Sequence, residues 1–230
     1  MIIQDNAIFI ADAHYNAKRT QLYKLLRLLQ NGTLSCSQIF LMGDIFDFLS
    51  SEIKYFKFVN KKVIRLINDL SNQYEIIYLE GNHDFNLKEL FPNIKVISRD
   101  MQPIYIQNKD HKIALAHGDI FTPFLYNLYT SIIRNHVFMK LINLIDINNF
   151  LSKKVETKLM GKKICHKQNN FLEFVSNRRK YYDSLSKVDL IIEGHFHQGY
   201  QSKNYINLPS LACDNRYMRY QNSQFSFNTL

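Results

Sequence analysis

Short apolar runs alternate with helical stripes along the first third of the chain. The runs at residues 7–11, 38–42 and 75–79 have the length of strands, and they predict buried strands because turn residues bound them. Between them, residues 18–30 and 55–70 space their apolar side chains three and four positions apart, which predicts two amphipathic helices. This order of strand, helix, strand, helix, strand favours parallel strands joined by right-handed crossovers.

Later in the chain the apolar runs follow one another with less room for helices between them. We expect strands at residues 95–98, 104–106, 112–116, 190–193 and 205–208, the last being the final core strand. A strand-rich second half after an alternating first half predicts an α+β fold. We expect two mixed sheets packed face to face, with helices outside them.

Residues 120–187 interrupt this series, because they contain no strand pattern. Apolar residues recur there at helical spacing, and no linker rich in Gly, Ser or Pro brackets the interval. We therefore expect one domain that spans residues 1–230, with residues 120–187 inserted in it as a helical cap.

Five short polar clusters lie where predicted strands end. They hold five of the eight histidines, and their other polar side chains are Asp and Asn. In chain order they are Asp12-Ala13-His14, Gly43-Asp44-Ile45-Phe46-Asp47, Gly81-Asn82-His83-Asp84, His117-Gly118-Asp119 and Gly194-His195-Phe196-His197. Each cluster alone has an ordinary explanation as a turn or a chance match, but all five together indicate one metal site.

Seven side chains of these clusters have the chemistry of metal ligands, and two divalent ions are the expected cofactors. Donors of this kind without a thiolate suit Mn²⁺, with Fe²⁺ or Zn²⁺ as alternatives. A carboxylate at Asp44 that bridges the ions gives each ion four protein bonds and leaves positions for water and substrate. Two such ions clamp a phosphoryl group and lower the pKa of a shared water. The expected ligands are Asp12, His14, Asp44, Asn82, His117, His195 and His197.

His83 and Asp84 are the expected catalytic pair. His83 lies one residue past a ligand, where it can either hydrogen-bond a phosphoryl oxygen or protonate the leaving group. Asp84 is expected to hold the tautomer of that imidazole. Asn82 and His83 are also expected to contact the substrate, and Lys167 is expected to neutralise charge on it.

The remaining polar residues of interest receive structural interpretations. Asp47 and Asp119 are expected to orient ligands rather than to bind metal. The histidines outside the clusters are expected to be structural or on the surface; they are His111, His136 and His166.

Net charge is +9, and residues 120–187 carry most of the excess, with twelve Lys and Arg against four Asp and Glu. This segment is either a solvated helical face or a surface that attracts an anionic partner. The three cysteines form no CxxC pair, so we expect a reducing compartment, no disulfide, and a buried Cys213. We identify neither a signal peptide nor a run of roughly 18 apolar residues that would span a membrane.

The motifs DxH, GDxxD, GNHD, HGD and GHxH, in this order, resemble those of the calcineurin-type metallophosphoesterase superfamily from about Ile8 to His197. The resemblance implies a four-layer αββα sandwich and a dinuclear site. It implies that Asp12, His14, Asp44 and His197 bind one ion, and that Asp44, Asn82, His117 and His195 bind the other.

Within the superfamily, the strings GDIFDF and HGD and the basic helical insertion are similar to those of the UDP-2,3-diacylglucosamine diphosphatase family of the lipid A pathway. That family's best-known branch usually has Arg where this chain has His83, the residue of the wider superfamily. The resemblance implies a lipid-linked nucleotide sugar as substrate, hydrolysed to UMP and a diacylated sugar 1-phosphate.

The same resemblance implies a cytoplasmic protein that is peripheral on the cytoplasmic face of the inner membrane and binds an anionic membrane surface. We expect no nucleic acid partner and no obligate protein partner. Two alternatives stay open: a phosphodiesterase or phosphatase for another phosphoester, and a scaffold that has lost its metals.

Overall fold

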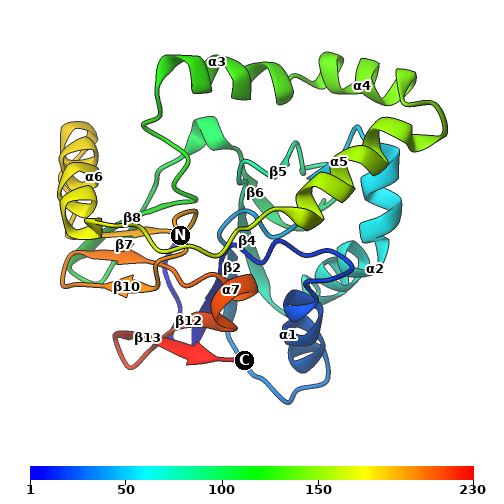
Figure 1. Ribbon diagram of the computed structural model, residues 1–230. Coiled ribbons are helices and arrows are strands. Elements are labelled where there is room, and N and C mark those ends of the chain that lie inside the picture. Colours follow the sequence, from blue (N-terminus) through cyan, green and yellow to red (C-terminus); the bar gives the residue numbers. More distant parts are fainter.

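Two β-sheets packed face to face form the centre of the computed structural model, which describes residues 1–230 (Figure 1). The larger sheet has the strand order β13 (Gln224–Thr229), β12 (Arg216–Gln221), β1 (Ala7–Ile10), β2 (Gln38–Leu41), β4 (Glu75–Leu79) and β6 (Lys95–Ile97). The second sheet has the order β10 (Tyr200–Gln201), β11 (Tyr205–Asn207), β9 (Leu190–Glu193), β8 (His111–Ala116) and β7 (Ile104–Asn108). A small parallel pair is formed by β3 (Leu49–Ser50) and β5 (Asp84–Phe85).

The larger sheet is parallel from β1 through β2 and β4 to β6, as the alternating first third of the sequence predicts. Helices α1 (Gln21–Gln30) and α2 (Lys54–Leu70) cover its outer face, where leucines of α1 pack on Ile8 and Ile10. Its inner face meets the second sheet through a core that includes Phe9 and Phe40, whose rings stack 4.4 Å apart. Because these strands are buried on both faces, they are apolar at nearly every position.

Helix α6 (Phe171–Leu185) covers the outer face of the second sheet through Val175 and Tyr182. The layers therefore run helix, sheet, sheet, helix, which confirms the predicted α+β sandwich. The 3₁₀ helix η1 (Arg99–Met101) and the short helix α7 (Leu211–Asp214) complete the core elements.

Three further helices lie between β8 and α6, along one edge of the molecule in Figure 1. They are α3 (Phe124–Ile133), α4 (His136–Ile145) and α5 (Phe150–Gly161), with the 3₁₀ helix η2 (Ile147–Asn149) before α5. Met139 of α4 attaches this group to the body by packing on Phe56 and Phe85. The division into one domain with a cap at residues 120–187 stays a prediction. None of the helices is both long and apolar enough to cross a membrane.

The prediction that the strand at residues 205–208 is the last in the core is wrong. Strand β12 lies inside the larger sheet, antiparallel to β1, and β13 pairs with β12 at the edge. In β12 only Tyr217, Met218 and Tyr220 are buried. The charged Arg216 and Arg219 interrupt the apolar pattern, and for this reason the run does not look like a core strand in the sequence.

The prediction of no disulfide is also wrong, because Cys165 and Cys213 form one. Cys213 is accordingly half of a cross-link rather than an isolated buried side chain, and Cys36 is the free cysteine. The partners are 48 positions apart, so only the fold brings their Cα atoms within reach.

Candidate metal centre

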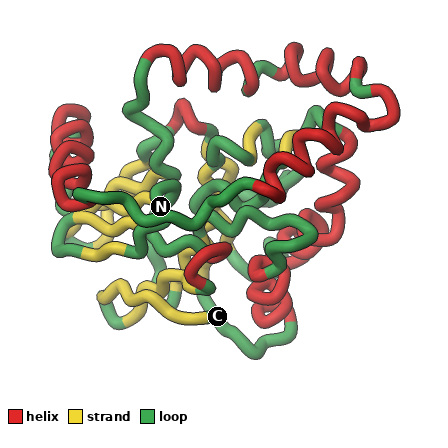
Figure 2. The backbone as a smooth tube through the Cα atoms, in the orientation of Figure 1, coloured by secondary structure: helices red, strands yellow, loops and turns green.

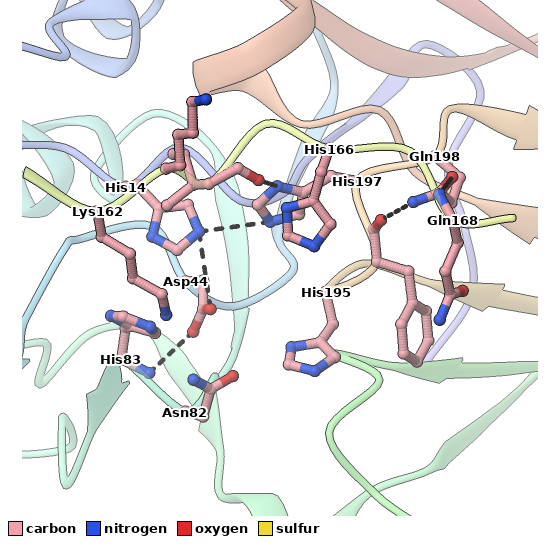
Figure 3. A pocket seen from close by; sticks show the side chains of 13 residues that line it. His14, Asp44, Asn82, His83, Lys162, His166, Gln168, His195, His197 and Gln198 are labelled. Carbon is pink, nitrogen blue, oxygen red and sulfur yellow. Dashed lines mark hydrogen bonds and ion pairs between the residues drawn. The ribbon is translucent and has the colours of Figure 1, made fainter. Parts of the chain in front are cut away.

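All seven predicted ligands lie at one end of the two sheets. Asp12 and His14 follow β1, Asp44 follows β2, and the others follow β4, β8 and β9. Side chains from two sheets therefore meet at the mouth of a cavity, where Figure 3 shows most of them pointing toward one another. Three sets have all their donor atoms within 4.8 Å of one another: Asp12, His14 and His197; His14, Asp44 and His83; and Asp44, His117 and His195.

The first set joins the cluster after β1 to the last cluster in the chain. Nε2 of His197 lies 3.3 Å from Oδ1 of Asp12 and 3.4 Å from Nε2 of His14. Backbone N–H of His195 donates to both oxygens of the Asp12 carboxylate, at 3.0 and 2.9 Å. Two imidazole nitrogens and a carboxylate thus face one point, which fits a borderline divalent ion.

The third set, Asp44, His117 and His195, is linked to the first through Asp44. Its Oδ2 lies 3.9 Å from Nε2 of His14, and its Oδ1 lies 3.5 Å from Nε2 of His117. Oδ1 of Asn82 lies 3.4 Å from the same His117 nitrogen, and the His195 ring is 5.0 Å from the His117 ring. The two oxygens of one carboxylate face different histidines, as a bridging ligand requires.

The backbone of this site is held in a conformation that L residues seldom adopt. Five of the seven predicted ligands have positive φ: Asp12 (49°), His14 (40°), Asp44 (51°), His195 (66°) and His197 (55°). Strain of this kind collects at functional sites, where the surrounding structure imposes it.

Glycines allow the clusters to approach closely. A Cβ on Gly43 would lie 2.4 Å from Nδ1 of His117, and one on Gly81 would lie 2.3 Å from Oδ1 of Asp44. Any side chain at these two positions would displace a predicted ligand.

Main-chain carbonyls fix the tautomers of two imidazoles. Nδ1 of His117 lies 2.9 Å from the carbonyl oxygen of Met42, and Nδ1 of His197 lies 3.0 Å from that of Ile164. A carbonyl only accepts, so each Nδ1 must carry a hydrogen, and in the neutral ring the lone pair is on Nε2. Such outer contacts orient histidines toward a metal.

The electrostatics of the site are dominated by Asp44. Burial raises the pKa of its carboxyl, but four histidines, His117 foremost, outweigh burial and hold the pKa well below its usual range. Burial lowers the pKa of His117, whereas Asp44 and other carboxylates outweigh burial and raise it to about 9. Burial and the neighbouring His117 lower the pKa of His195 to about 4. Because the pKa of His117 is raised, a divalent ion that binds His117 must displace a proton from it.

His83 lines the cavity, but Asp84 does not orient it, which corrects the expected pairing. Nδ1 of His83 lies 2.7 Å from the carbonyl oxygen of Asp47 and donates to it, which leaves Nε2 free. The buried Asp84 carboxylate instead accepts from the Tyr78 hydroxyl and from the backbone N–H groups of Asp44, Ile45, Phe46 and Gly81. Through these hydrogen bonds Asp84 holds the loops of the metal site in place, so its role is to fix their conformation.

Asp47 contacts a predicted ligand, whereas Asp119 does not. Oδ1 of Asp47 lies 3.5 Å from Nδ1 of His14, and its Oδ2 lies 2.5 Å from Arg19. Asp119 pairs with Arg99 at 3.0 Å. The carboxylate of Asp47 is therefore placed to orient His14, as the sequence predicts.

The cavity has a volume of about 350 Å³, and eleven of its thirteen lining residues are polar or charged (Figure 3). Several lie in the loop between α5 and α6, where the sequence contains no motif: Lys162, Lys163, His166 and Gln168. His166 was expected only to be structural or on the surface, so its place in the cavity wall is new. Nζ of Lys167 donates to the carbonyl oxygen of His197 at 2.6 Å, and its contact with substrate stays a prediction.

Comparison with known proteins agrees with this geometry. The family model described as calcineurin-like phosphoesterase matches residues 6–199. The chain is similar to proteins named UDP-2,3-diacylglucosamine hydrolase. The relative from Psychromonas ingrahamii is 23% identical over 199 residues (83% of this chain, 80% of the relative). The one from Vibrio atlanticus is 22% identical over 196 residues (83% and 80%), and one from Coxiella burnetii is 23% identical over 199 residues (84% and 81%).

Among solved structures, a protein of unknown function from Aquifex aeolicus aligns over 89% of both chains, with 15% identity and a TM-score of 0.44.

Proposed function

The chain belongs to the calcineurin-like phosphoesterase family, and from this premise we propose that it hydrolyses the pyrophosphate of UDP-2,3-diacylglucosamine to UMP and 2,3-diacylglucosamine 1-phosphate. Membership makes it a metal-dependent phosphoester hydrolase. The lipid-linked substrate rests on the names of the relatives and on one observation: a polar metal cavity opens beside helices whose apolar and basic side chains are exposed.

We assign one ion to Asp12, His14, Asp44 and His197, and the other to Asp44, Asn82, His117 and His195. Mn²⁺ is the ion we propose, since no thiolate is among the donors. When bound, the ions supply a nucleophile from water at neutral pH and neutralise the phosphoryl oxygens.

The chain's own residues complete the reaction around the substrate. Nε2 of His83 is the ring nitrogen left for a ligand, and we place it against a phosphoryl oxygen or the leaving oxygen. Lys162 and Lys163 line the same cavity and supply positive charge for the second phosphate. Lys167 extends this basic edge beside the carbonyls of His197 and Gln198.

The acyl chains require an apolar surface, which the cavity lacks and the helices α3 to α5 provide. Monomeric proteins seldom expose large apolar patches unless something binds there. The exposed apolar residues of this surface are Phe124, Leu125, Leu128, Tyr129, Ile132, Val137, Phe138, Leu141, Leu144, Ile145, Ile147, Phe150, Leu151 and Val155. Exposed lysines lie among them, at 140, 153, 154 and 158. An apolar surface with a basic fringe also suits docking on an anionic bilayer, so we propose a peripheral membrane location.

The direct test is hydrolysis of UDP-2,3-diacylglucosamine in detergent micelles with Mn²⁺, in water enriched in heavy oxygen. We expect UMP that carries the heavy oxygen, because water attacks the phosphorus on the uridine side. Hydrolysis of simple phosphodiesters without turnover of the lipid would show that this enzyme acts on another phosphoester.

Polar substitution at Phe150, which is 68% exposed, should affect the lipid substrate selectively. We expect Phe150→Ser to lower kcat/KM for the diacylated substrate about tenfold, because an aromatic contact with an acyl chain is lost. A small chromogenic phosphodiester should be hydrolysed at the normal rate. The matched control is Leu172→Ser, which removes an equally exposed apolar residue (69%) on α6. Equal losses on both substrates would contradict the assignment of this surface to acyl chains.

His83→Ala should lower kcat about a hundredfold without loss of metal, since the imidazole acts on the substrate and not as a ligand. Metal content by mass spectrometry and steady-state kinetics check this. A phosphodiester with a strongly acidic leaving group distinguishes the two proposed roles of His83, general acid and phosphoryl contact. Such a leaving group needs no protonation, so a general acid would be dispensable for this substrate. His111→Ala, an exposed histidine of β8, is the control. Loss of bound metal in His83→Ala would instead identify His83 as a ligand.

A further inference from the structure

The segment between α5 and α6, residues 162–168, crosses the mouth of the metal cavity and is called the strap here. It passes from α5 across the molecule to α6 in Figure 1, and Figure 2 draws it as loop. Five of the cavity's lining residues belong to it. The strap forms no helix or strand, so contacts with other segments must fix its position.

Hydrogen bonds hold the strap to His197 and Gln198, and a covalent bond joins it to helix α7. Nζ of Lys167 donates to the carbonyl oxygen of His197 at 2.6 Å, and backbone N–H of Gln168 donates to Oε1 of Gln198 at 3.0 Å. Cys165 is joined by a disulfide to Cys213 of α7. Helix α7 is itself fixed to the core, since the N–H of Leu211 donates to the carbonyl oxygen of Ala11 at 3.0 Å.

The strap in turn fixes a predicted metal ligand. The carbonyl oxygen of Ile164, one residue before the disulfide, accepts the Nδ1 hydrogen of His197 at 3.0 Å. That bond directs Nε2 of the same ring toward Asp12 and His14. Loss of a partner of this kind costs about 10-fold to 100-fold in metal affinity in other proteins.

The other proposed metal position does not depend on the strap. Nδ1 of His117 donates to the carbonyl oxygen of Met42, which directly follows the central strand β2. Met42 is fully buried and is held by the hydrogen bond from its N–H to Ile10. The histidines of the two metal positions are therefore oriented by carbonyl groups from different places, one at the end of a core strand and one in a cross-linked loop.

We propose that the Cys165–Cys213 disulfide is a positioning device for His197, so that breaking it weakens the metal position of Asp12, His14 and His197 and leaves the other position unchanged. The inference rests on the proposed function only in requiring that the site binds two ions. Cys165 is exposed and Cys213 is half-buried, so a reductant can reach the bond.

A dithiol supplies the electrons and protons that reduction of this disulfide requires. A thiolate of the dithiol attacks one sulfur, the Sγ–Sγ bond breaks, and the mixed disulfide is resolved by the second thiol. Two electrons and two protons pass to Cys165 and Cys213, which become thiols, and the reductant becomes a disulfide. The same protein is then able to hold two ions when oxidised and one ion firmly when reduced.

The test compares Cys165→Ser/Cys213→Ser with Cys36→Ser, which removes the free cysteine and keeps the cross-link. Mn²⁺ is titrated calorimetrically into chelator-stripped protein, and hydrogen exchange of residues 163–168 is followed without metal. We expect two binding events in Cys36→Ser. In the double variant we expect one unchanged event, one weakened about 10-fold to 100-fold, and faster exchange in the strap. Wild-type protein treated with a phosphine reductant provides the same comparison should the double variant fold poorly.

Three results would overturn the inference. They are three free thiols in the untreated protein, identical Mn²⁺ affinities with and without the cross-link, and equal weakening of both events, which would indicate a general loss of structure. Absence of any Mn²⁺ binding by the oxidised protein would overturn the proposed function as well. Two tight events in both redox states would overturn only the inference.

Discussion

Asp44→Asn should reduce turnover by on the order of a thousandfold or more, because the stabilisation that two ions give a phosphoryl transition state amounts to several kcal/mol. The carboxylate of Asp44 has one oxygen facing His14 and the other facing His117. An amide of the same shape keeps the packing but supplies one weak oxygen donor in place of two charged ones. Bound metal, measured by mass spectrometry, should fall from two ions per chain to one or none.

The fold should survive this substitution. The carboxylate's main electrostatic partner is His117, whose pKa Asp44 helps to raise to about 9. Without that carboxylate the largest influence that raises the pKa of His117 is lost, so burial favours the neutral imidazole more strongly and less buried charge is left unpaired. Asp110→Asn, in the exposed turn between β7 and β8, is the control and should retain full activity and two ions. Normal turnover in Asp44→Asn would refute a dinuclear mechanism.

Arg178→Met should destabilise the protein by about 3–5 kcal/mol, because it leaves the buried Glu193 carboxylate without its cation. The guanidinium of Arg178 pairs with both oxygens of Glu193 and donates to the carbonyl oxygens of Ile120 at 2.8 Å and Gly118 at 3.2 Å. Burial lowers the pKa of this guanidinium, but Glu193 outweighs burial and raises it, so the guanidinium keeps its positive charge. Thermal unfolding should shift downward by on the order of 10 °C.

Arg178 also joins the loops that carry two predicted ligands, since Gly118 follows His117 and Glu193 lies two residues before His195. The control is Lys180→Met, an exposed residue of the same helix, which should leave Tm unchanged. Adding Glu193→Gln to Arg178→Met should recover part of the lost stability, because the unpaired charge is then removed. A loss of the same size in the double variant would mean that lost packing, not the unpaired charge, sets the cost.

The residues of the charged segment show why composition could not reveal its role. Of the basic residues between 120 and 187, Arg178 is buried in an ion pair, Lys162 lines the cavity, and Lys153 is exposed on α5. Their charges are identical in the sequence, and only their neighbours distinguish a structural arginine from a lysine that faces a ligand.

The predicted catalytic histidine illustrates a similar limit. The neighbour of His83 in sequence is Asp84, yet its neighbour in space is the carbonyl oxygen of Asp47, 36 positions away. Adjacent residues of an extended segment point in opposite directions, so Asp84 turns into the core while His83 faces the cavity. The Asp84 carboxylate shapes the loop after β2, a task that its position in the motif does not indicate.

The sequence alone determined the parallel core strands, the sandwich class and the seven predicted ligands that the fold brings together, because apolar runs and metal-ligand motifs are local patterns that can be read from the chain directly. Tertiary structure alone decided the Cys165–Cys213 bond, the place of β12 beside β1, and the strap carbonyl that orients His197. Each of these contacts joins residues that are distant in the chain, through backbone atoms or cysteine sulfurs. Nothing in a sequence pattern marks which partner such atoms will meet. Their partners are set by where the two sheets and the helices place them.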